Sequence, residues 1–269
     1  MRTVPQYMDA VRQNKAIIFN GLTFNPLRVK HYALYRNAKP AMELMQSTLP
    51  PMLARKSWCA CLDAMDRQTI QETGKNPGML TSVLLFLNTA LDLRAEIDES
   101  RLRLARDKSG DLKAIVIRTQ FDELTALDMP AMGKVREILA AQNCFEIPDE
   151  RHNPDLVRAE QYLQSQRQSE LVFDVEDLVY SVAVNTGHRA EEIWEWPIRE
   201  FEKTQAAIDR KLYFKILLGA EMSGRVKFKT GNPCPSWRYD KKTELPGGFI
   251  KISDLDAGAK GLLKGPETN

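Results

Sequence analysis

Few side chains in this sequence have the type and spacing that catalysis requires. The chain contains three histidines, His31, His152 and His188, so a Ser-His-Asp arrangement would have to use one of them. No G-x-S-x-G nucleophile elbow accompanies them. The phosphate-loop spacing G-x-x-x-x-G-K-(S/T) and the dinucleotide-binding spacing G-x-G-x-x-G are also absent from the sequence. We therefore expect a protein that is not an enzyme, with no catalytic residues and no cofactor.

Four glutamates lie close together in the second half of the chain: Glu191, Glu192, Glu195 and Glu200. Paired carboxylates can act as general acid and base when their environments push their pKa values apart. Acidic residues are far more common at the exposed starts of helices, because the N-terminal end of the helix dipole favours negative charge. We interpret this group as structural.

The cysteines offer a weak case for a metal site. Cys59 and Cys61 form a Cys-x-Cys pair that could bind zinc together with Cys234. No CxxC or HxxxH pair accompanies them, and a disulfide framework is not typical of so long a chain with so few cysteines. We expect small buried thiols and no metal.

The stretch from Asp174 to Gly224 has the clearest helical pattern in the chain. Asp174 is a suitable N-cap, and Gly187 is placed to end the first helix. Pro197 can begin the next helix, because its missing N–H would be unpaired at that position in any case. Gly224 is placed to end it. Once this second helix is under way, its apolar residues recur at helical spacing: Phe201, Ile208, Leu212 and Ile216.

Aromatic residues mark two places where a partner could bind. Trp194, Trp196 and Phe201 cluster where the two helices meet, and we expect this joint to pack helix against helix. Trp237 and Tyr239 lie in residues 225–242, a basic segment with interleaved aromatic residues. Such segments can bind single-stranded nucleic acid through phosphate contacts and base stacking, although a folded-back loop is the interpretation we favour. These aromatic residues are the candidate partner-binding residues.

The rest of the chain predicts helices with small hairpins. Asn20-Gly21 is a strong signal for a tight hairpin turn. Residues 27–93 have a helical pattern, in which we expect Pro40 to start a second helix. Residues 101–118 alternate in polarity around Gly110, as a strand–turn–strand unit does, and a helix is expected from about Met129. A thinner apolar stripe predicts a further helix over residues 156–166.

These patterns predict a mainly α fold with small β-hairpins (α+β), in which a multi-helix globular core carries an appended hairpin. We divide the chain into residues 1–98, an N-terminal hairpin plus helical region, and residues 99–150, a β-hairpin and helix unit. Residues 151–269 are then a C-terminal helical region with the basic, proline-containing loop and a mobile tail.

Bulk properties exclude some classes of protein. The net charge of +2 gives no general electrostatic case for nucleic acid, so we do not expect nucleic-acid binding. No apolar run reaches the ~18 residues that suggest a membrane span, and residues 1–10 lack the apolar core of a signal peptide. We expect a protein that stays in the cytoplasm where it is made.

Three segments carry a resemblance to a known class of proteins. Residues 173–201, with the Glu191–Trp196 block and Arg199-Glu200-Phe201, resemble the C-terminal part of the tail-assembly chaperones of tailed bacteriophages. Residues 32–66 and 226–240 are similar to tail-module proteins of phages that infect Gram-positive bacteria. Our chain is longer than a minimal chaperone and contains a hairpin insert.

The resemblance implies a non-enzymatic, chaperone-like assembly factor in the host cytoplasm. Its partner would be a helical tail protein, such as the tape-measure protein, or the tail tube. The extra length leaves open a structural virion protein of the tail, baseplate or head–tail connector. The basic segment 225–242 leaves open a third alternative, a nucleic-acid-binding module.

Overall fold

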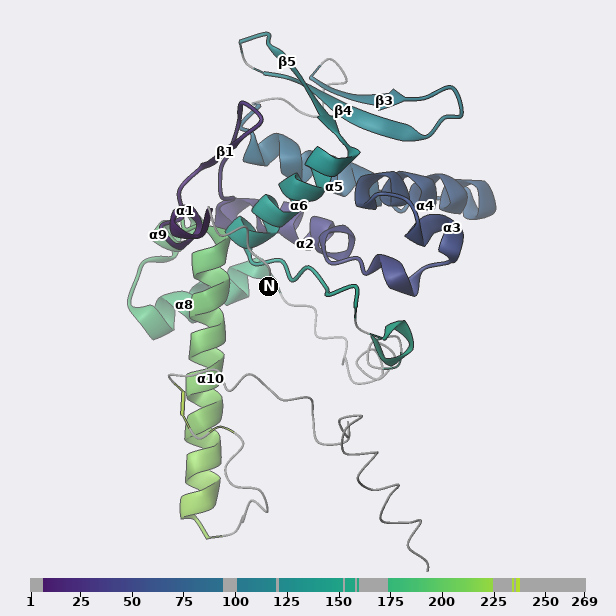
Figure 1. Cartoon of the computed structure of the whole chain (residues 1–269). Coiled ribbons are helices and arrows are strands. Elements are labelled where there is room, and N and C mark those ends of the chain that lie inside the picture. The colour runs from purple at the N-terminus through teal and green to yellow at the C-terminus, as the bar shows by residue number, and fades with distance from the viewer. Residues whose placement is uncertain are drawn as a thin grey trace, which may run out of the picture. The chain divides into compact units, whose positions relative to one another are not determined.

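The fold is described from a computed structural model of the whole chain (Figure 1). The chain forms two compact units, Met1–Gln205 and Ala206–Asn269, and each is described by itself. The described residues are 7–93, 101–119, 121–151, 153–157, 159, 174–224, 234, 236 and 237. The predicted boundaries after residues 98 and 150 stay a prediction.

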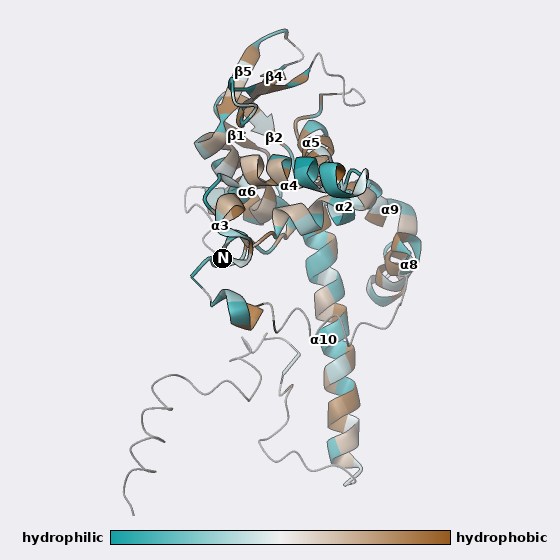
Figure 2. Ribbon diagram, turned by 90° about the vertical axis from the view of Figure 1, so that its right-hand side faces the viewer, coloured by the Kyte–Doolittle hydropathy of each residue, from teal (hydrophilic) through white to brown (hydrophobic). Residues whose placement is uncertain are grey.

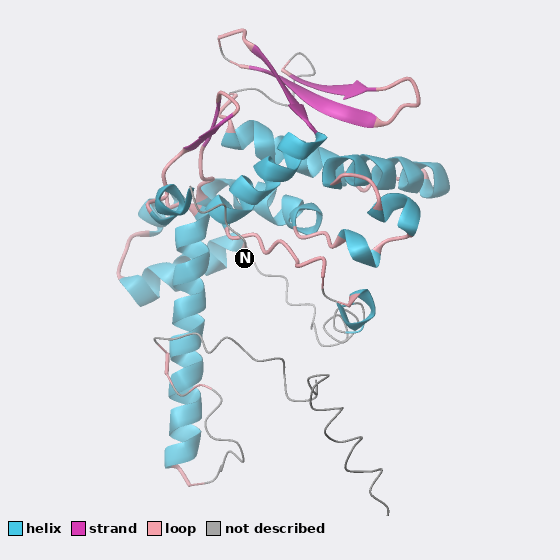
Figure 3. Ribbon diagram, in the orientation of Figure 1, coloured by secondary structure: helices cyan, strands magenta, loops and turns pink. Residues whose placement is uncertain are grey.

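The first unit is mainly helical and carries two small antiparallel sheets (Figure 3), which confirms the predicted fold class. Its helices in the first half are α1 (Met8–Arg12), α2 (Tyr32–Met42), α3 (Pro51–Ala54), α4 (Trp58–Thr73) and α5 (Met79–Ala90), with short 3-10 turns at Val29–His31 and Gln46–Thr48. Those in the second half are α6 (Met129–Asn143), α8 (Val175–Thr186), α9 (Ala190–Trp194) and the start of α10 (Ile198–Met222).

The first sheet is the predicted hairpin. Strands β1 (Ile17–Phe19) and β2 (Leu22–Phe24) pair in antiparallel register. Asn20 and Gly21 both have positive φ, 49° and 74°, as a type I′ turn requires. The side chains of Ile17, Leu22 and Phe24 are buried, so the hairpin covers part of the core.

The second sheet has one strand more than the sequence predicts. Strands β3 (Leu102–Arg106) and β4 (Leu112–Arg118) form the predicted pair, and β5 (Leu124–Asp128) adds to the other side of β4 in the order β3-β4-β5. The sheet lies over helices of the first unit, with β4 against α4 and β5 continuing into α6 (Figure 1). The predicted helix from Met129 is correct, and the five residues before it form strand β5.

Pro40 corrects the expectation that it starts a helix. Helix α2 runs through Pro40 and ends at Met42. Proline has no backbone N–H, so the helix lacks the one hydrogen bond that residue 40 would donate to the carbonyl four residues earlier. Pro40 is two residues from the end of α2, and the helix continues across this single missing bond. The chain therefore forms one helix in this segment instead of two.

Five aromatic rings contact one another in succession through the core of the first unit, and we call them the ring chain. Phe201 meets Tyr32 edge-on at 5.8 Å, and Tyr32 lies 5.3 Å from Tyr35. Tyr35 stacks on Phe145 at 4.7 Å, and Phe145 contacts Phe86 edge-on at 5.2 Å. Ring pairs at such distances stabilise the fold beyond the burial of their apolar surface. The ring chain therefore joins four segments in the core: α10, α2, α5 and the residues just after α6.

A buried arginine holds α6 against the C-terminal end of α2. Arg136 donates from Nε to the carbonyl of Met42 at 2.9 Å and from Nη2 to that of Leu44 at 2.8 Å. Its guanidinium lies 4.9 Å from the centroid of the Trp58 ring. Burial lowers the pKa of Arg136 to about 10, which still leaves it charged at neutral pH.

The predicted ends of α8 and α10 are confirmed. The Asp174 side chain accepts a hydrogen bond from the Glu176 backbone N–H, and Gly187 follows α8 with a φ of 78°. Gly224 has a φ of 69° just after α10. Most of the predicted helix over residues 156–166, and most of segment 225–242, lie outside the described residues.

Candidate partner-binding surfaces

The joint between α9 and α10 is held to the core by backbone hydrogen bonds. Val29 N donates to Trp196 O at 2.9 Å, and Ile198 N donates to Leu27 O at 2.8 Å. These two bonds pair the joint with the segment just before α2, like one rung of an antiparallel ladder. The backbone of the joint is therefore fixed to the core, while the packing of helix against helix by its tryptophans stays a prediction.

Two of the four glutamates of this region, Glu192 and Glu195, are engaged by neighbouring basic side chains. Glu195 lies 2.6 Å from Nη1 of Arg28 and 3.0 Å from Nζ of Lys30, and hydrogen bonds from Lys30 and then Arg28 lower its pKa. A hydrogen bond from His188, at 3.2 Å, is the main cause that lowers the pKa of Glu192. An acid–base pair needs one carboxyl with a raised pKa, and neither of these two glutamates has that property.

The three aromatic candidates at the joint differ in exposure. Phe201 is completely buried in the ring chain, so a partner cannot reach it. Trp194 and Trp196 are half-buried, and Trp196 contacts the His188 ring edge-on at 5.0 Å. The two tryptophans thus keep part of their surface open, while Phe201 anchors α10.

The candidates in the second unit are only partly described. Trp237 is 39% exposed, and Lys211 Nζ lies 5.9 Å from the centroid of its ring. Tyr239, the remaining candidate, lies outside the described residues.

The apolar stripe of α10 changes character along the helix. Its first member, Phe201, is fully buried, whereas Leu212 is 46% and Ile216 is 68% exposed. Tyr213, also exposed, lies three residues before Ile216 and hence on the same side of the helix. We call Leu212, Tyr213 and Ile216 the α10 apolar face. Figure 2 shows the apolar residues of α10 interspersed with polar ones along the helix.

Basic residues border this face. Lys211 and Lys215 are four residues apart, so they lie on one edge of the helix, beside Leu212 and Ile216. Both are exposed. A helix face with large apolar side chains and a cationic edge is suited to an amphipathic helix that carries acidic residues along its own edge.

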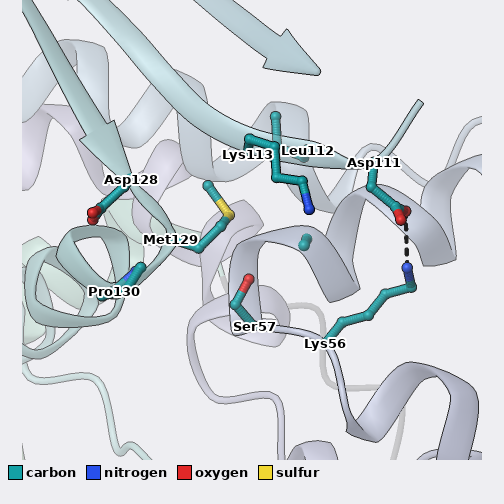
Figure 4. Close-up of a pocket in the computed structure, with 9 residues that line it drawn as sticks. Lys56, Ser57, Asp111, Leu112, Lys113, Asp128, Met129 and Pro130 are labelled. Atoms are coloured by element: carbon teal, nitrogen blue, oxygen red, sulfur yellow. Dashed lines mark hydrogen bonds and ion pairs between the residues drawn. The ribbon is translucent and has the colours of Figure 1, made fainter. Parts of the chain in front are cut away.

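A pocket of about 350 Å³, lined by both charged and apolar residues, lies in the first unit between the start of α4 and the second sheet (Figure 4). Lys56 Nζ lies 2.9 Å from Asp111 Oδ1 there, and a hydrogen bond from Lys56 is the main cause that lowers the pKa of Asp111. Lys113 pairs with Asp107 at 3.0 Å. Ser57 is the hydroxyl in the lining, and no histidine accompanies it as a base. Lys56 and Asp111 thus pair within the pocket, whereas Asp107 is not a lining residue and the Asp128 carboxylate accepts from Ala131 N as the cap of α6.

The cysteines in the described ranges do not form a metal site. Cys59 and Cys61 are buried, and burial raises the pKa of the Cys59 thiol to about 12. Within these ranges no three His, Cys, Asp or Glu side chains are grouped so that they could hold a metal ion. None of the described helices combines the length and the apolar composition that crossing a bilayer requires.

Comparison of the chain with protein-family models, curated proteins and solved structures found no match.

Sequence reasoning identified Leu212 and Ile216 as members of the α10 stripe but did not say whether they are buried or exposed. It omitted Tyr213, whose three-residue spacing from Ile216 was the available signal. The periodicity predicts that the helix continues towards Met222, but it does not predict which of its apolar residues are exposed.

Proposed function

We propose that this protein is a non-enzymatic assembly factor that binds an amphipathic helix of a partner protein through the α10 apolar face. The observation that carries this proposal is the exposure of Leu212, Tyr213 and Ile216 on one side of a regular helix. Large apolar side chains grouped on a surface are typical of interaction sites, because leaving them in water is unfavourable. Helix-in-groove binding uses anchors at this same three- and four-residue spacing.

The resemblance to tail-assembly chaperones suggests the partner, a helical tail protein of a tailed bacteriophage such as the tape-measure protein. The edge formed by Lys211 and Lys215 favours a partner helix with acidic residues beside its apolar anchors. In this account the factor acts in the host cytoplasm and covers apolar helix surface until the tail is built.

Co-expression with each tail protein of the same phage tests the proposal. We expect one helical tail protein to co-elute with the chain in size-exclusion chromatography, and the Leu212→Gln/Ile216→Gln variant to lose it. Val184→Gln on α8 is the matched control, because it also replaces an exposed aliphatic side chain on a helix. Failure of every tail protein to co-elute, or equal retention by the double variant, would refute the proposal.

Mass spectrometry of purified virions separates this function from a structural one. An assembly factor should be absent from the finished particle. A fixed copy number of the chain in the particle would instead support a component of the tail, baseplate or head–tail connector. Self-association of the chain that depends on Ile216 would show that the α10 apolar face pairs with a second copy, which also contradicts the proposal.

A further inference from the structure

A second surface, in the first unit, has the properties of a docking groove. Helices α3 and α4 enclose a depression of about 500 Å³. Its apolar part is formed by Met52, Leu53 and Ala64, and its polar part includes Arg67 and Gln71. Met52 is 83% exposed, so most of its side chain is open to a ligand in the groove.

The charged residues that line the groove are both basic. Arg67 and Lys56 are among its lining residues, and the lining contains no carboxylate. Behind the groove, Asp63 pairs with Arg67 at 2.9 Å and with Arg106 at 2.6 Å, and Asp111 pairs with Lys56 at 2.9 Å. Each of the two lining cations therefore has a carboxylate partner, and the cluster carries one positive charge in excess because Asp63 also pairs with Arg106, which is not a lining residue. Arg55 follows α3 and lies between the lining residues Leu53 and Lys56 in the sequence; it is exposed and adds a further positive charge to this segment.

Arg67 uses only part of its hydrogen-bonding capacity. Its Nη2 is engaged by Asp63, and its Nε is buried without a hydrogen-bond partner. The buried Nε is out of reach of a docked segment, but the Arg67 side chain as a whole is 41% exposed, so its outer nitrogens can donate to an additional carboxylate.

We propose that the α3–α4 groove docks a segment of a partner protein in which an apolar anchor residue lies next to acidic residues. The anchor packs on Met52 and Leu53, since methionine adapts to differently shaped side chains. The acidic residues lie against Arg55, Lys56 and Arg67. A peptide fits better than nucleic acid because the lining has no aromatic ring on which a base could stack. This inference goes beyond the proposed function and does not rest on it, because the groove and the α10 apolar face are in different units.

A yeast-displayed random peptide library provides the test. The full-length protein is used to select peptides, with the Met52→Ser/Arg55→Glu variant as the counter-selection. Both side chains are exposed, so we expect the variant to keep its fold. The Met222→Ser/Lys75→Glu variant is the matched control, because it makes the same exchanges at exposed positions elsewhere.

We expect the selected peptides to combine Leu, Met or Phe with several Asp or Glu residues. Fluorescence anisotropy of a selected peptide should show affinity at least tenfold weaker for Met52→Ser/Arg55→Glu than for the wild type or the control. The affinity should also fall as salt is raised, since exposed charges are screened. Selected peptides without acidic residues, no selective enrichment, or tighter binding of a single-stranded oligonucleotide that depends on Arg55 would each overturn the proposal.

Discussion

Replacing Phe201 by alanine should destabilise the protein more than replacing any other aromatic residue of the α9–α10 joint. The Phe201 side chain is fully buried and ends the ring chain on Tyr32. Removing a buried phenylalanine costs ~3–5 kcal/mol, which includes the cavity that remains. Tyr32 would lose its edge-on neighbour, although its hydroxyl would keep the 2.6 Å hydrogen bond to Glu202. We therefore expect a loss of about 4 kcal/mol in the free energy of unfolding.

Trp196→Ala is the matched comparison. The Trp196 ring is larger but only half-buried, and its ring partner is the exposed His188. We expect Trp196→Ala to lower the free energy of unfolding by about 2 kcal/mol, which is half of the loss for a tryptophan in the core. The Trp196 backbone carbonyl that accepts from Val29 is unaffected by the substitution.

Urea denaturation followed by far-UV circular dichroism measures both losses. Phe201→Leu should recover most of the stability, because it refills the cavity with an apolar side chain. A loss below about 1.5 kcal/mol for Phe201→Ala would refute the claim that the ring chain anchors α10. A larger loss for Trp196→Ala than for Phe201→Ala would refute it as well.

Three further predictions follow from other buried contacts. Asp66→Ala should cost about 1–2 kcal/mol in urea denaturation, because the carboxylate accepts the first two N–H groups of α5, at 3.1 and 2.8 Å; an unchanged midpoint would contradict this capping role. Arg136→Lys should lower the free energy of unfolding by roughly 2–3 kcal/mol, because one ammonium group cannot reach the carbonyls of both Met42 and Leu44 and leaves an acceptor unpaired. A variant as stable as the wild type would show that these contacts are dispensable. Cys59 should react with a thiol reagent at pH 8 far more slowly in the native protein than in the urea-unfolded protein, because burial raises its pKa to about 12 and keeps the thiol protonated. Equal rates would show that the reagent reaches Cys59 in the native protein.

Local signals predicted the elements whose conformation depends on a few adjacent residues. The Asn20-Gly21 turn, the Asp174 cap and the glycine after α8 were all correct, because each depends on side chains or φ values within a few positions. The paired strands β3 and β4 were correct for the same reason, since their alternation is visible in sequence.

The errors arose where tertiary contacts decide. Strand β5 has little alternation of its own and gains its hydrogen bonds by pairing with β4, so its sequence alone did not indicate a strand. Pro40 has a strong local preference for the start of a helix, yet packing of the flanking residues Ala38, Ala41 and Met42 in the core keeps α2 continuous. Periodicity identified the stripe on α10 but did not distinguish its buried beginning from its exposed continuation, because both have the same spacing.

The most direct test of the central claim is a calorimetric titration of the co-eluting tail protein into the wild type and into Leu212→Gln/Ile216→Gln. If the α10 apolar face forms the contact, losing both anchors should cost about 2–4 kcal/mol of binding free energy, which is roughly a 30- to 700-fold weaker affinity. Wild-type binding should also show a negative heat-capacity change, as burial of apolar surface produces. The same affinity for both proteins, with the double variant still folded, would contradict the account.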